Sequence, residues 1–339
     1  MTVNRLPPGY TVRPATLQDV PQVVETLNAA SRAIMGVEKH NPTDLANEWG
    51  DPGFEPERDT LLVYDPDGRL VGYQEVYDPS DPHVRIGTWG QVHPDYTGCG
   101  IGSYLLEWAE QRARSAIPKA PPEAQVLLDA FILTIHPKAI ELYNHNGFDV
   151  VRYNLRMVID LNGHPAEPVW PEGISVRPMV LGQDERAIVT AIRESFRDHW
   201  GFVERPFDAD LAHFEHRKQE KDYFDPDLQF IAWDGDQVAG ISLCLPKWFD
   251  DPELGWVSTL GVLRPWRRRG LGLALLQHSF QELYRRGQRR VGLGVDASSL
   301  TGATQLYLKA GMQSDPNRQF ALLHKVLRPG KDLSTQTVE

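Results

Sequence analysis

Apolar residues from Val257 to Leu263 form a short run that predicts a buried strand, and a turn rich in arginine follows it. Beyond the turn, apolar residues recur at a spacing of three or four positions, which predicts a helix with one buried face: Leu271, Leu275, Leu276 and Phe280. Gly270 and Gly272 begin that helix, where the backbone can approach another group closely because no Cβ intervenes. A strand, a glycine-rich turn and a helix N-terminus form an anion site, and the nearby guanidinium groups favour phosphate.

The same pattern occurs twice along the chain. Four landmarks recur in the same order, at offsets of 164 to 170 residues. They are a strand ending at proline (10–14 and 174–178), a hairpin with an Asp/Gly turn (61–72 and 230–240), the strand with its glycine-rich turn (92–102 and 262–272), and a helix ending before a glycine (139–148 and 303–312). An ordered recurrence of this kind indicates a tandem repeat of one domain, and it argues against a mere basic surface turn.

Each repeat contains a strand, a helix, a hairpin, a strand, a helix, a strand, a helix and a strand. This order predicts an α/β domain with a central mixed sheet flanked by helices. We place the N-terminal domain at residues 1–160 and the C-terminal domain at residues 174–328. Segment 161–173 carries three prolines and no apolar period, which predicts a stiff linker. The polar tail, residues 329–339, is expected to be disordered.

Composition restricts the possible partners. The 339 residues carry a net charge of −11, which disfavours nucleic acid, although eight arginines gather between Arg264 and Arg290. No apolar run is long enough to span a membrane, so no membrane partner is expected. Two cysteines, Cys99 and Cys244, cannot form a disulfide framework, which favours a cytoplasmic location. We expect a monomer or a homodimer.

These landmarks resemble the GNAT superfamily of acyl-CoA-dependent N-acetyltransferases. The central motif of that family is Arg or Gln, two residues, Gly, one residue, then Gly or Ala, placed directly after a strand. The segment from Arg267 to Gly272 fits this motif fully, whereas the first copy has Thr97 where Arg or Gln is usual. A late helix ending in tyrosine and followed by glycine is also typical of the family, and it too occurs twice. The resemblance covers both repeats and implies two tandem GNAT domains.

The resemblance implies acetyl-CoA as cosubstrate. Its pyrophosphate would lie on the backbone amides of Arg267, Arg268, Arg269, Gly270, Leu271 and Gly272. Its pantetheine arm would pair with the strand at Leu260, Gly261 and Val262, whose last amide would stabilise the oxyanion. The corresponding residues of the first repeat are Val92, Thr97, Gly98, Cys99, Gly100, Ile101 and Gly102. That copy lacks the arginines, so we expect the C-terminal domain to be catalytic and the N-terminal domain to bind coenzyme weakly or to be non-catalytic.

The resemblance makes Tyr307 the general acid near the departing sulfur, with Tyr143 as its counterpart in the first repeat. Many relatives place the general base as a glutamate on the strand before the motif, but that position is Trp256 here. The nearest candidates are Glu253, Asp251 and Asp250 before that strand and Asp296 at the end of the next, and Glu253 and Asp296 are favoured among them. Acids that flank strands often cap turns instead, so the base stays unassigned. His213 and His216 lack a third ligand, and no metal is expected.

The sequence therefore predicts an N-acetyltransferase that moves the acetyl group of acetyl-CoA to a primary amine of a small molecule, by direct attack in a ternary complex. The aromatic and polar segment 196–204 is a candidate wall of the acceptor pocket, and packing of its aromatics onto the core is an equally open alternative. Among tandem members the arrangement is similar to the mycothiol synthase subfamily, but it lacks the strand acid and the usual Asn within 296–303. Two alternatives stay open: a non-catalytic acyl-CoA-binding or sensing protein, and an acetyltransferase of a peptide or protein amine.

Overall fold

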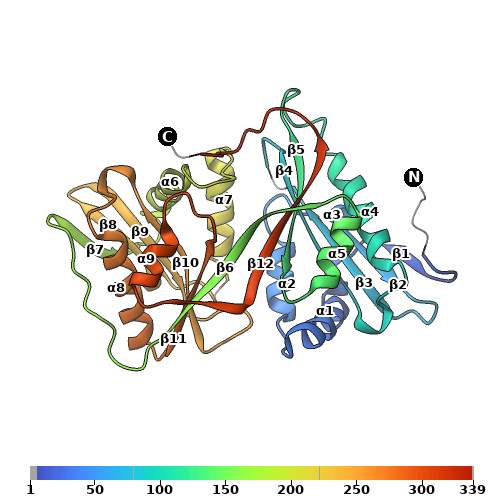
Figure 1. The fold of residues 1–339 in the computed structure, drawn as a ribbon, viewed down its shortest axis with the longest axis horizontal. Helices are drawn as coiled ribbons and strands as arrows, with labels where there is room; N and C mark the ends of the chain where they lie inside the picture. Colours follow the sequence, from blue (N-terminus) through green and yellow to red (C-terminus); the bar gives the residue numbers. More distant parts are fainter. Residues whose placement is uncertain (1–5, 79, 221, 338–339) are drawn as a thin grey trace. The chain divides into compact units, whose positions relative to one another are not determined.

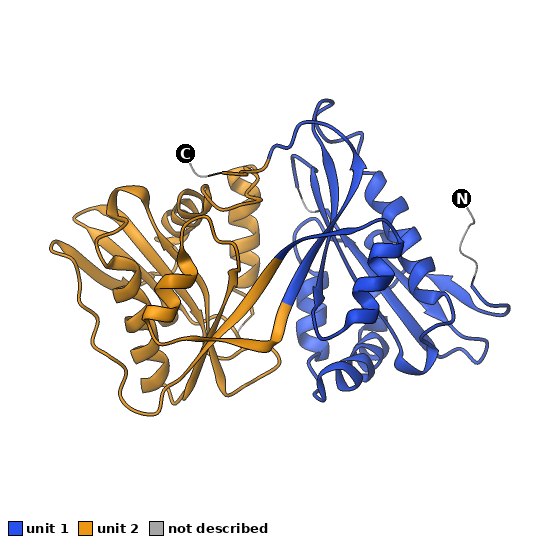
Figure 2. Ribbon diagram, in the orientation of Figure 1, with its two compact units in different colours: residues 1–152, 320–333 blue, residues 153–319, 334–339 orange. Residues whose placement is uncertain are grey.

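A computed structural model of the chain describes residues 6–78, 80–220 and 222–337, which form two compact units (Figures 1 and 2). Unit 1 comprises residues 1–152 and 320–333, and unit 2 comprises residues 153–319 and 334–339. Each unit has a mixed sheet with helices on both faces, as the order of predicted elements indicates. Among the described residues, no helix is long and apolar enough to cross a membrane.

The sheet of unit 1 has the strand order β1-β2-β3-β4-β5-β12, with only β4 and β5 parallel among the pairs it contains. Helices α1 and α2 pack on one face and α4 on the other. The elements of this part of the chain are β1 (Thr11–Arg13), α1 (Val20–Met35), α2 (Pro42–Trp49), α3 (Pro56–Asp59), β2 (Thr60–Tyr64), β3 (Leu70–Tyr77), β4 (Arg85–Val92), α4 (Ile101–Arg114), β5 (Val126–Leu133) and α5 (Pro137–His145).

The sheet of unit 2 repeats this plan in the order β6-β11-β10-β9-β8-β7, with β10 and β11 parallel. Helices α6 and α7 cover one face, and α8 and α9 cover the other. The remaining elements are β6 (Asp149–Asp160), β7 (Ile174–Pro178), α6 (Glu185–Phe196), α7 (Phe207–Arg217), β8 (Gln229–Asp234), β9 (Gln237–Leu245), β10 (Leu254–Val262), α8 (Leu271–Arg285), β11 (Arg290–Asp296), α9 (Ala303–Lys309) and β12 (Gln313–Arg328).

The apolar pattern of α8 is reproduced in the core. All four of its predicted core residues are buried, at 0–2% exposure: Leu271, Leu275, Leu276 and Phe280. They pack against the sheet that carries the arginine-rich turn. Burial of a side chain of this size stabilises a fold by roughly 1.5–3 kcal/mol, so this face fixes where the N-terminus of α8 lies.

The last strand of each repeat completes the sheet of the other unit. Residues 154–160 of β6 pair with β11 in unit 2, and residues 320–328 of β12 pair with β5 in unit 1. The predicted domains, 1–160 and 174–328, follow the sequence repeat, whereas the compact units follow this exchange. Because the two sheets are similar, the last strand of either repeat could pair with the edge of either sheet. The alternation of apolar and polar side chains along the strand is the same in both cases and does not reveal which sheet it joins.

The segments expected to be linker and tail are both held by contacts with the rest of the chain. The Leu161 amide donates to the Arg289 carbonyl (2.7 Å), and the Trp170 ring lies 5.6 Å from that of His278. In the tail, the Gly201 amide donates to the Thr335 carbonyl (2.8 Å), and the Thr335 amide donates to the Phe202 carbonyl (2.9 Å). The expected disorder of the tail is therefore wrong at Lys331, whose backbone bonds to Glu123 and Gln125, and at Thr335, whose backbone bonds to Gly201 and Phe202.

Candidate active site

Strands β10 and β11 of unit 2 separate after a short parallel pairing. They pair only from Leu254–Val257 with Arg290–Leu293, yet β10 continues to Val262 and β11 to Asp296. A register shift of β10 against β9, between Val257 and Thr259, accompanies the separation. The Leu263 amide donates to the Ala239 carbonyl of β9 (3.0 Å), and amides alternate along a strand. The amides of Leu260 and Val262 therefore face the open edge toward β11.

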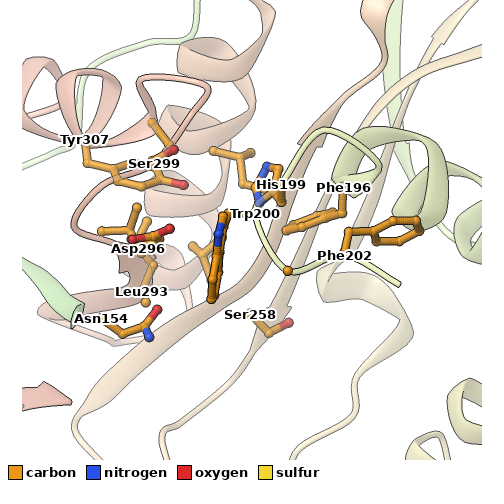
Figure 3. A pocket seen from close by; sticks show the side chains of 16 residues that line it. Asn154, Phe196, His199, Trp200, Phe202, Ser258, Leu293, Asp296, Ser299 and Tyr307 are labelled. Carbon is orange, nitrogen blue, oxygen red and sulfur yellow. The ribbon is translucent and has the colours of Figure 1, made fainter. Parts of the chain in front are cut away.

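A cavity of about 400 Å³ lies in this opening (Figure 3). Ser258 and Leu260 line it from β10, and Asp296 lines it from the end of β11. The segment after α6 closes another side with His199 and Trp200. Three sequence candidates, Leu260, Asp296 and Tyr307, are thus brought together around one space. The predicted pocket role of segment 196–204 is consistent with this geometry.

Tyr307 lies on α9 and lines the cavity. Burial raises the pKa of its phenol to about 12. Among the described residues, no group forms a hydrogen bond with its hydroxyl, whereas tyrosine hydroxyls buried in a core usually have a partner. The hydroxyl is therefore available to a molecule in the cavity.

His199 follows a buried ion-pair cluster at the end of α6. Asp198 is 3% exposed, accepts hydrogen bonds from both Arg264 and Arg267, and has a pKa held far below its usual range mainly by Arg264. The His199 ring lies 4.3 Å from that of Phe196. Burial, reinforced by the positive charge of Arg267, lowers the pKa of His199, while Asp296 opposes that shift. The imidazole is therefore uncharged at neutral pH.

The arginine-rich turn divides into a structural and an exposed part. Arg267 donates to the carbonyls of Val262 (3.0 Å) and Ser195 (3.1 Å) as well as to Asp198, so its guanidinium ties the turn to α6 and β10. Arg268 and Arg269 are exposed. Gly270 precedes α8 with φ of +88°, a conformation that disfavours any side chain. The backbone amides at the start of α8 and the exposed guanidinium groups of Arg268 and Arg269 are thus available to bind an anion.

Three further predicted residues, two glycines and a glutamate, serve packing or lie away from the cavity. A Cβ added to Gly261 would approach the Ser195 hydroxyl to 2.3 Å, so this glycine allows α6 to contact β10. Gly272 likewise allows close contact with Leu306 of α9, at 3.3 Å for an added Cβ. Glu253 is exposed and is not among the residues lining the cavity, which leaves Asp296 as the carboxylate of the original pair that lies there.

Residues that the sequence did not single out also line the cavity, including Asn154 and Ser258. Asn154 belongs to β6 and pairs with Asp296 in register. Because β6 belongs to the first repeat in the sequence, only the strand exchange brings Asn154 to this site. Ser258 sits at the irregularity of β10 and donates to the Leu243 carbonyl (2.9 Å). No pattern in the sequence marked either position.

Unit 1 repeats the backbone of the site with different side chains. Strands β4 and β5 pair only over Arg85–Gly87 and Leu127–Asp129 before they separate. Gly98 and Gly100 have φ of +81°, Gly102 lies against Leu142, and Ile101 is buried at the start of α4. Thr97 and Cys99 are exposed in the turn, and the Val92 amide has the same orientation as that of Val262 because His93 pairs with Val71.

The tyrosine and the strand opening of unit 1 also differ from those of unit 2. Tyr143 is buried and hydrogen-bonded to Gln74, and burial raises its pKa. Asp129 occupies the register position of Leu293 and pairs with Arg85 at 2.8 Å. The opening of unit 1 thus holds an internal ion pair at the position where unit 2 has an apolar cavity wall.

Comparison with known proteins agrees with this geometry. The sequence model of the acetyltransferase (GNAT) family matches residues 189–312, and that of a GNAT acetyltransferase domain matches residues 57–150. The chain is 30% identical over 304 residues to the mycothiol acetyltransferase of Stackebrandtia nassauensis, covering 86% of this chain and 91% of that protein. It is 31% identical over 241 residues to the mycothiol acetyltransferase of Streptomyces scabiei, covering 69% and 70%.

Solved structures show the same two-unit fold. A GCN5-related N-acetyltransferase from Sphaerobacter thermophilus matches with a TM-score of 0.79 and 34% identity, covering 98% of this chain and 100% of that one. A tandem GNAT protein from the clavulanic acid biosynthesis pathway matches with a TM-score of 0.69 at 14% identity, which supports the fold alone; the match covers 95% of this chain and all of that one.

The chain is an acyltransferase with two tandem acetyltransferase folds. It belongs to the GNAT family, and its relatives include the mycothiol acetyltransferases. The predicted family, fold class and enzyme class are therefore confirmed. Members of this family use acetyl-CoA. Among the described residues, no group of three or more His, Cys, Asp or Glu side chains can hold a metal ion.

Proposed function

We propose that unit 2 transfers the acetyl group of acetyl-CoA to a primary amine of a small molecule, by direct attack while both substrates are bound. The observation that carries this proposal is the cavity between the separated ends of β10 and β11. It has strand amides on one side, and Tyr307, His199 and Asp296 around it (Figure 3). A reactive acyl group held on the open strand edge would lie beside all three side chains.

The residues of unit 2 fit a thioester of coenzyme A. The open edge at Leu260 and Val262 offers backbone partners to the amide-containing pantetheine arm. The N-terminus of α8, with Arg268 and Arg269, suits the phosphates. Arg267 holds the turn in place rather than contacting phosphate, because its guanidinium already donates to three groups of the protein. When bound, acetyl-CoA supplies an activated acetyl group.

Two side chains are suited to handle the protons of the reaction. An alkylammonium must lose a proton before its nitrogen can attack, and the uncharged His199 imidazole can accept it. Asp296 provides a negative charge in the same cavity to attract the ammonium form. Tyr307, with a pKa of about 12, stays protonated and can donate a hydrogen bond to the departing sulfur. His199 replaces the strand glutamate that this chain lacks.

The acceptor is proposed to be a small molecule for two reasons. The cavity of about 400 Å³ is of the size that small-molecule sites usually have. The similar proteins from Stackebrandtia nassauensis and Streptomyces scabiei are mycothiol acetyltransferases, which favours an acceptor amine of related chemistry. Phe196, Trp200 and Phe202 offer apolar surface to the remainder of such a molecule.

Unit 1 is proposed to be non-catalytic. Its tyrosine, Tyr143, is hydrogen-bonded to Gln74, and its glycine-rich turn carries Thr97 and Cys99 where unit 2 carries arginines. It retains the open edge and the left-handed glycines, so a weak coenzyme site is compatible with its backbone.

Incubation with acetyl-CoA and a panel of amines, with a reagent that detects free thiol, tests the proposal. Release of coenzyme A that depends on a small amine, together with the mass of the acetylated product, would support it. Binding of acetyl-CoA without thiol release from any small or peptide amine would favour a sensing protein. Turnover with peptide amines alone would favour the protein-directed alternative.

A further inference from the structure

Unit 1 contains a carboxylate with no basic partner, Glu75, on the face of β3 that packs against α1 and α2. Glu75 is half-buried and accepts a hydrogen bond from the Tyr73 hydroxyl, which in turn accepts one from the Trp49 indole at 3.0 Å. Among the described residues, no lysine or arginine forms an ion pair with it. Burial raises the pKa of Glu75 to about 7, which is the expected cost of desolvating a carboxylate without a cation.

The other buried or half-buried carboxylates of this unit show what is missing. Five of them each contact a basic side chain: Asp19 with Arg13, Asp59 with Arg112, Asp78 with Lys119, Glu110 with Lys325, and Asp129 with Arg85. A carboxylate removed from water is stabilised by such a partner and is costly without one. Glu75 differs from these five, since its hydrogen bond comes from a phenol. Asp65 also accepts from a phenol, that of Tyr96, but the amides of Asp67 and Arg69 stabilise its charge as well.

Unit 2 provides an internal comparison. The pairings of Gly72 with Val92 and of Gly240 with Val262 align β3 with β9. Tyr73, Glu75 and Tyr77 then correspond to three apolar residues: Ile241, Leu243 and Leu245. Ile241 and Leu243 pack against α6 and α7 in the core. The same fold thus accepts plain apolar residues on this face, and the carboxylate of unit 1 is not required for folding.

Aromatic rings surround Glu75. Trp89 lies directly across from it on β4, and the Tyr73 ring lies 6.1 Å from both the Trp89 ring and the Trp49 ring. Trp49 and Tyr73 are buried, whereas Trp89 and Glu75 are half-buried, so solvent reaches the cluster at Trp89 and Glu75. Ring faces attract cations, most strongly those of tryptophan.

The neighbouring titratable groups do not neutralise Glu75. Burial lowers the pKa of His40, whose ring is 5.6 Å from that of Trp89, to about 4, so His40 is uncharged at neutral pH. On α2, Glu48 adds negative charge near Tyr73, and the Tyr77 hydroxyl donates to Asp51. The positive charge of Lys39 also lowers the pKa of His40, and no ion pair joins Lys39 to Glu75 among the described residues. Apart from Lys39, the named neighbours of Glu75 are aromatic, neutral or acidic.

We propose that Glu75 and Trp89 form a binding site for an organic ammonium group, with Tyr73 and Trp49 packed behind them. The carboxylate supplies the counter-charge, and the Trp89 ring supplies apolar and cation–π contact. This site belongs to unit 1 and is separate from the acetyl-transfer cavity, so it does not depend on the proposed function.

Calorimetric titration of the full chain tests the proposal, with choline, ethanolamine and the uncharged analogue 3,3-dimethylbutan-1-ol as probes. At least one of the two cations should bind tenfold or more tightly than the neutral alcohol, and Glu75→Gln should weaken that binding about tenfold or more. Since the cation requires the ionised carboxylate, binding should be about tenfold tighter at pH 8 than at pH 6, given a pKa near 7. The choice between choline and ethanolamine reveals whether a methylated or a primary ammonium is preferred.

Two controls separate binding from folding. Glu57→Gln, an exposed glutamate of the same unit, removes the same charge and should leave the affinity unchanged. Glu75→Leu, which copies unit 2, should abolish binding while the thermal midpoint stays equal to or above that of the wild type. Ammonium binding in unit 2 would survive both Glu75 variants. If neither cation binds better than the alcohol, or if Glu75→Gln binds them as the wild type does, the proposal is overturned.

Discussion

Within the arginine-rich turn Arg267 has a structural role, whereas Arg268 and Arg269 are exposed, and this difference leads to a prediction about Arg267. Its side chain is 27% exposed and bonds to the carbonyls of Val262 and Ser195 and to the buried carboxylate of Asp198. Each bond contributes about 0.5–1.5 kcal/mol, and Arg264 still neutralises Asp198 when Arg267 is removed. Arg267→Ala should therefore destabilise unit 2 by about 2 kcal/mol, which lowers its thermal midpoint by roughly 4–8 °C.

The exposed arginines should behave in the opposite way. The double variant Arg268→Ala and Arg269→Ala should keep the wild-type thermal midpoint but bind coenzyme A more weakly. The loss should be largest at low salt, because exposed charges are screened. Differential scanning fluorimetry gives the midpoints, and calorimetric titration with coenzyme A at two salt concentrations gives the affinities. If Arg267→Ala were as stable as the wild type and lost affinity as the double variant does, the structural role of Arg267 would be wrong.

Three further outcomes follow from the geometry of unit 2. The pKa of His199 is lowered from 6.5, so kcat/KM should fall only as pH drops below about 6.5, where the imidazole becomes protonated. His199→Gln should abolish this fall at acid pH and should reduce kcat by about 10²–10⁴-fold. The depressed pKa of Asp198 stabilises the fold above the unfolded value of 3.8, and this contribution is lost as pH falls through the folded pKa; Asp198→Asn should flatten the acid side of a stability–pH curve. Arg268 has φ of +61°, a strained conformation for a residue with a side chain, where the first repeat has Gly98. Arg268→Gly should therefore raise the free energy of unfolding, measured in urea, by roughly 0.5–1 kcal/mol while it weakens coenzyme binding. A loss of stability would show that the backbone at Arg268 is not strained.

Local patterns predicted much of the fold. The spacing of Leu271, Leu275, Leu276 and Phe280 identified the buried face of α8, because helical periodicity depends only on the helix itself. The recurrence of the glycine-rich turns, at 92–102 and 262–272, identified the two repeats. These features are fixed within a few residues of the chain, and a single sequence therefore reveals them.

Features that depend on distant parts of the chain were not predictable. The exchange of β6 and β12 places Asn154 in the cavity, although the side-chain alternation of β6 would be the same in either sheet. The role of Arg267 depends on Asp198, which lies 69 positions earlier and reaches it only through the packing of α6 on β10. Glu253 was a candidate base because it precedes β10, yet β10 lines the cavity with residues further along the strand, Val257, Ser258 and Leu260.

The most direct test of the central claim compares the tyrosines of the two repeats. With acetyl-CoA and an amine found in the panel assay, the rate of thiol release gives kcat for Tyr307→Phe and for Tyr143→Phe. Our account predicts a loss of up to about 10²–10⁴-fold for Tyr307→Phe, because its hydroxyl faces the cavity, and near wild-type kcat for Tyr143→Phe. Loss of activity in Tyr143→Phe with an unaffected Tyr307→Phe would move the acetyl transfer to unit 1 and contradict the account.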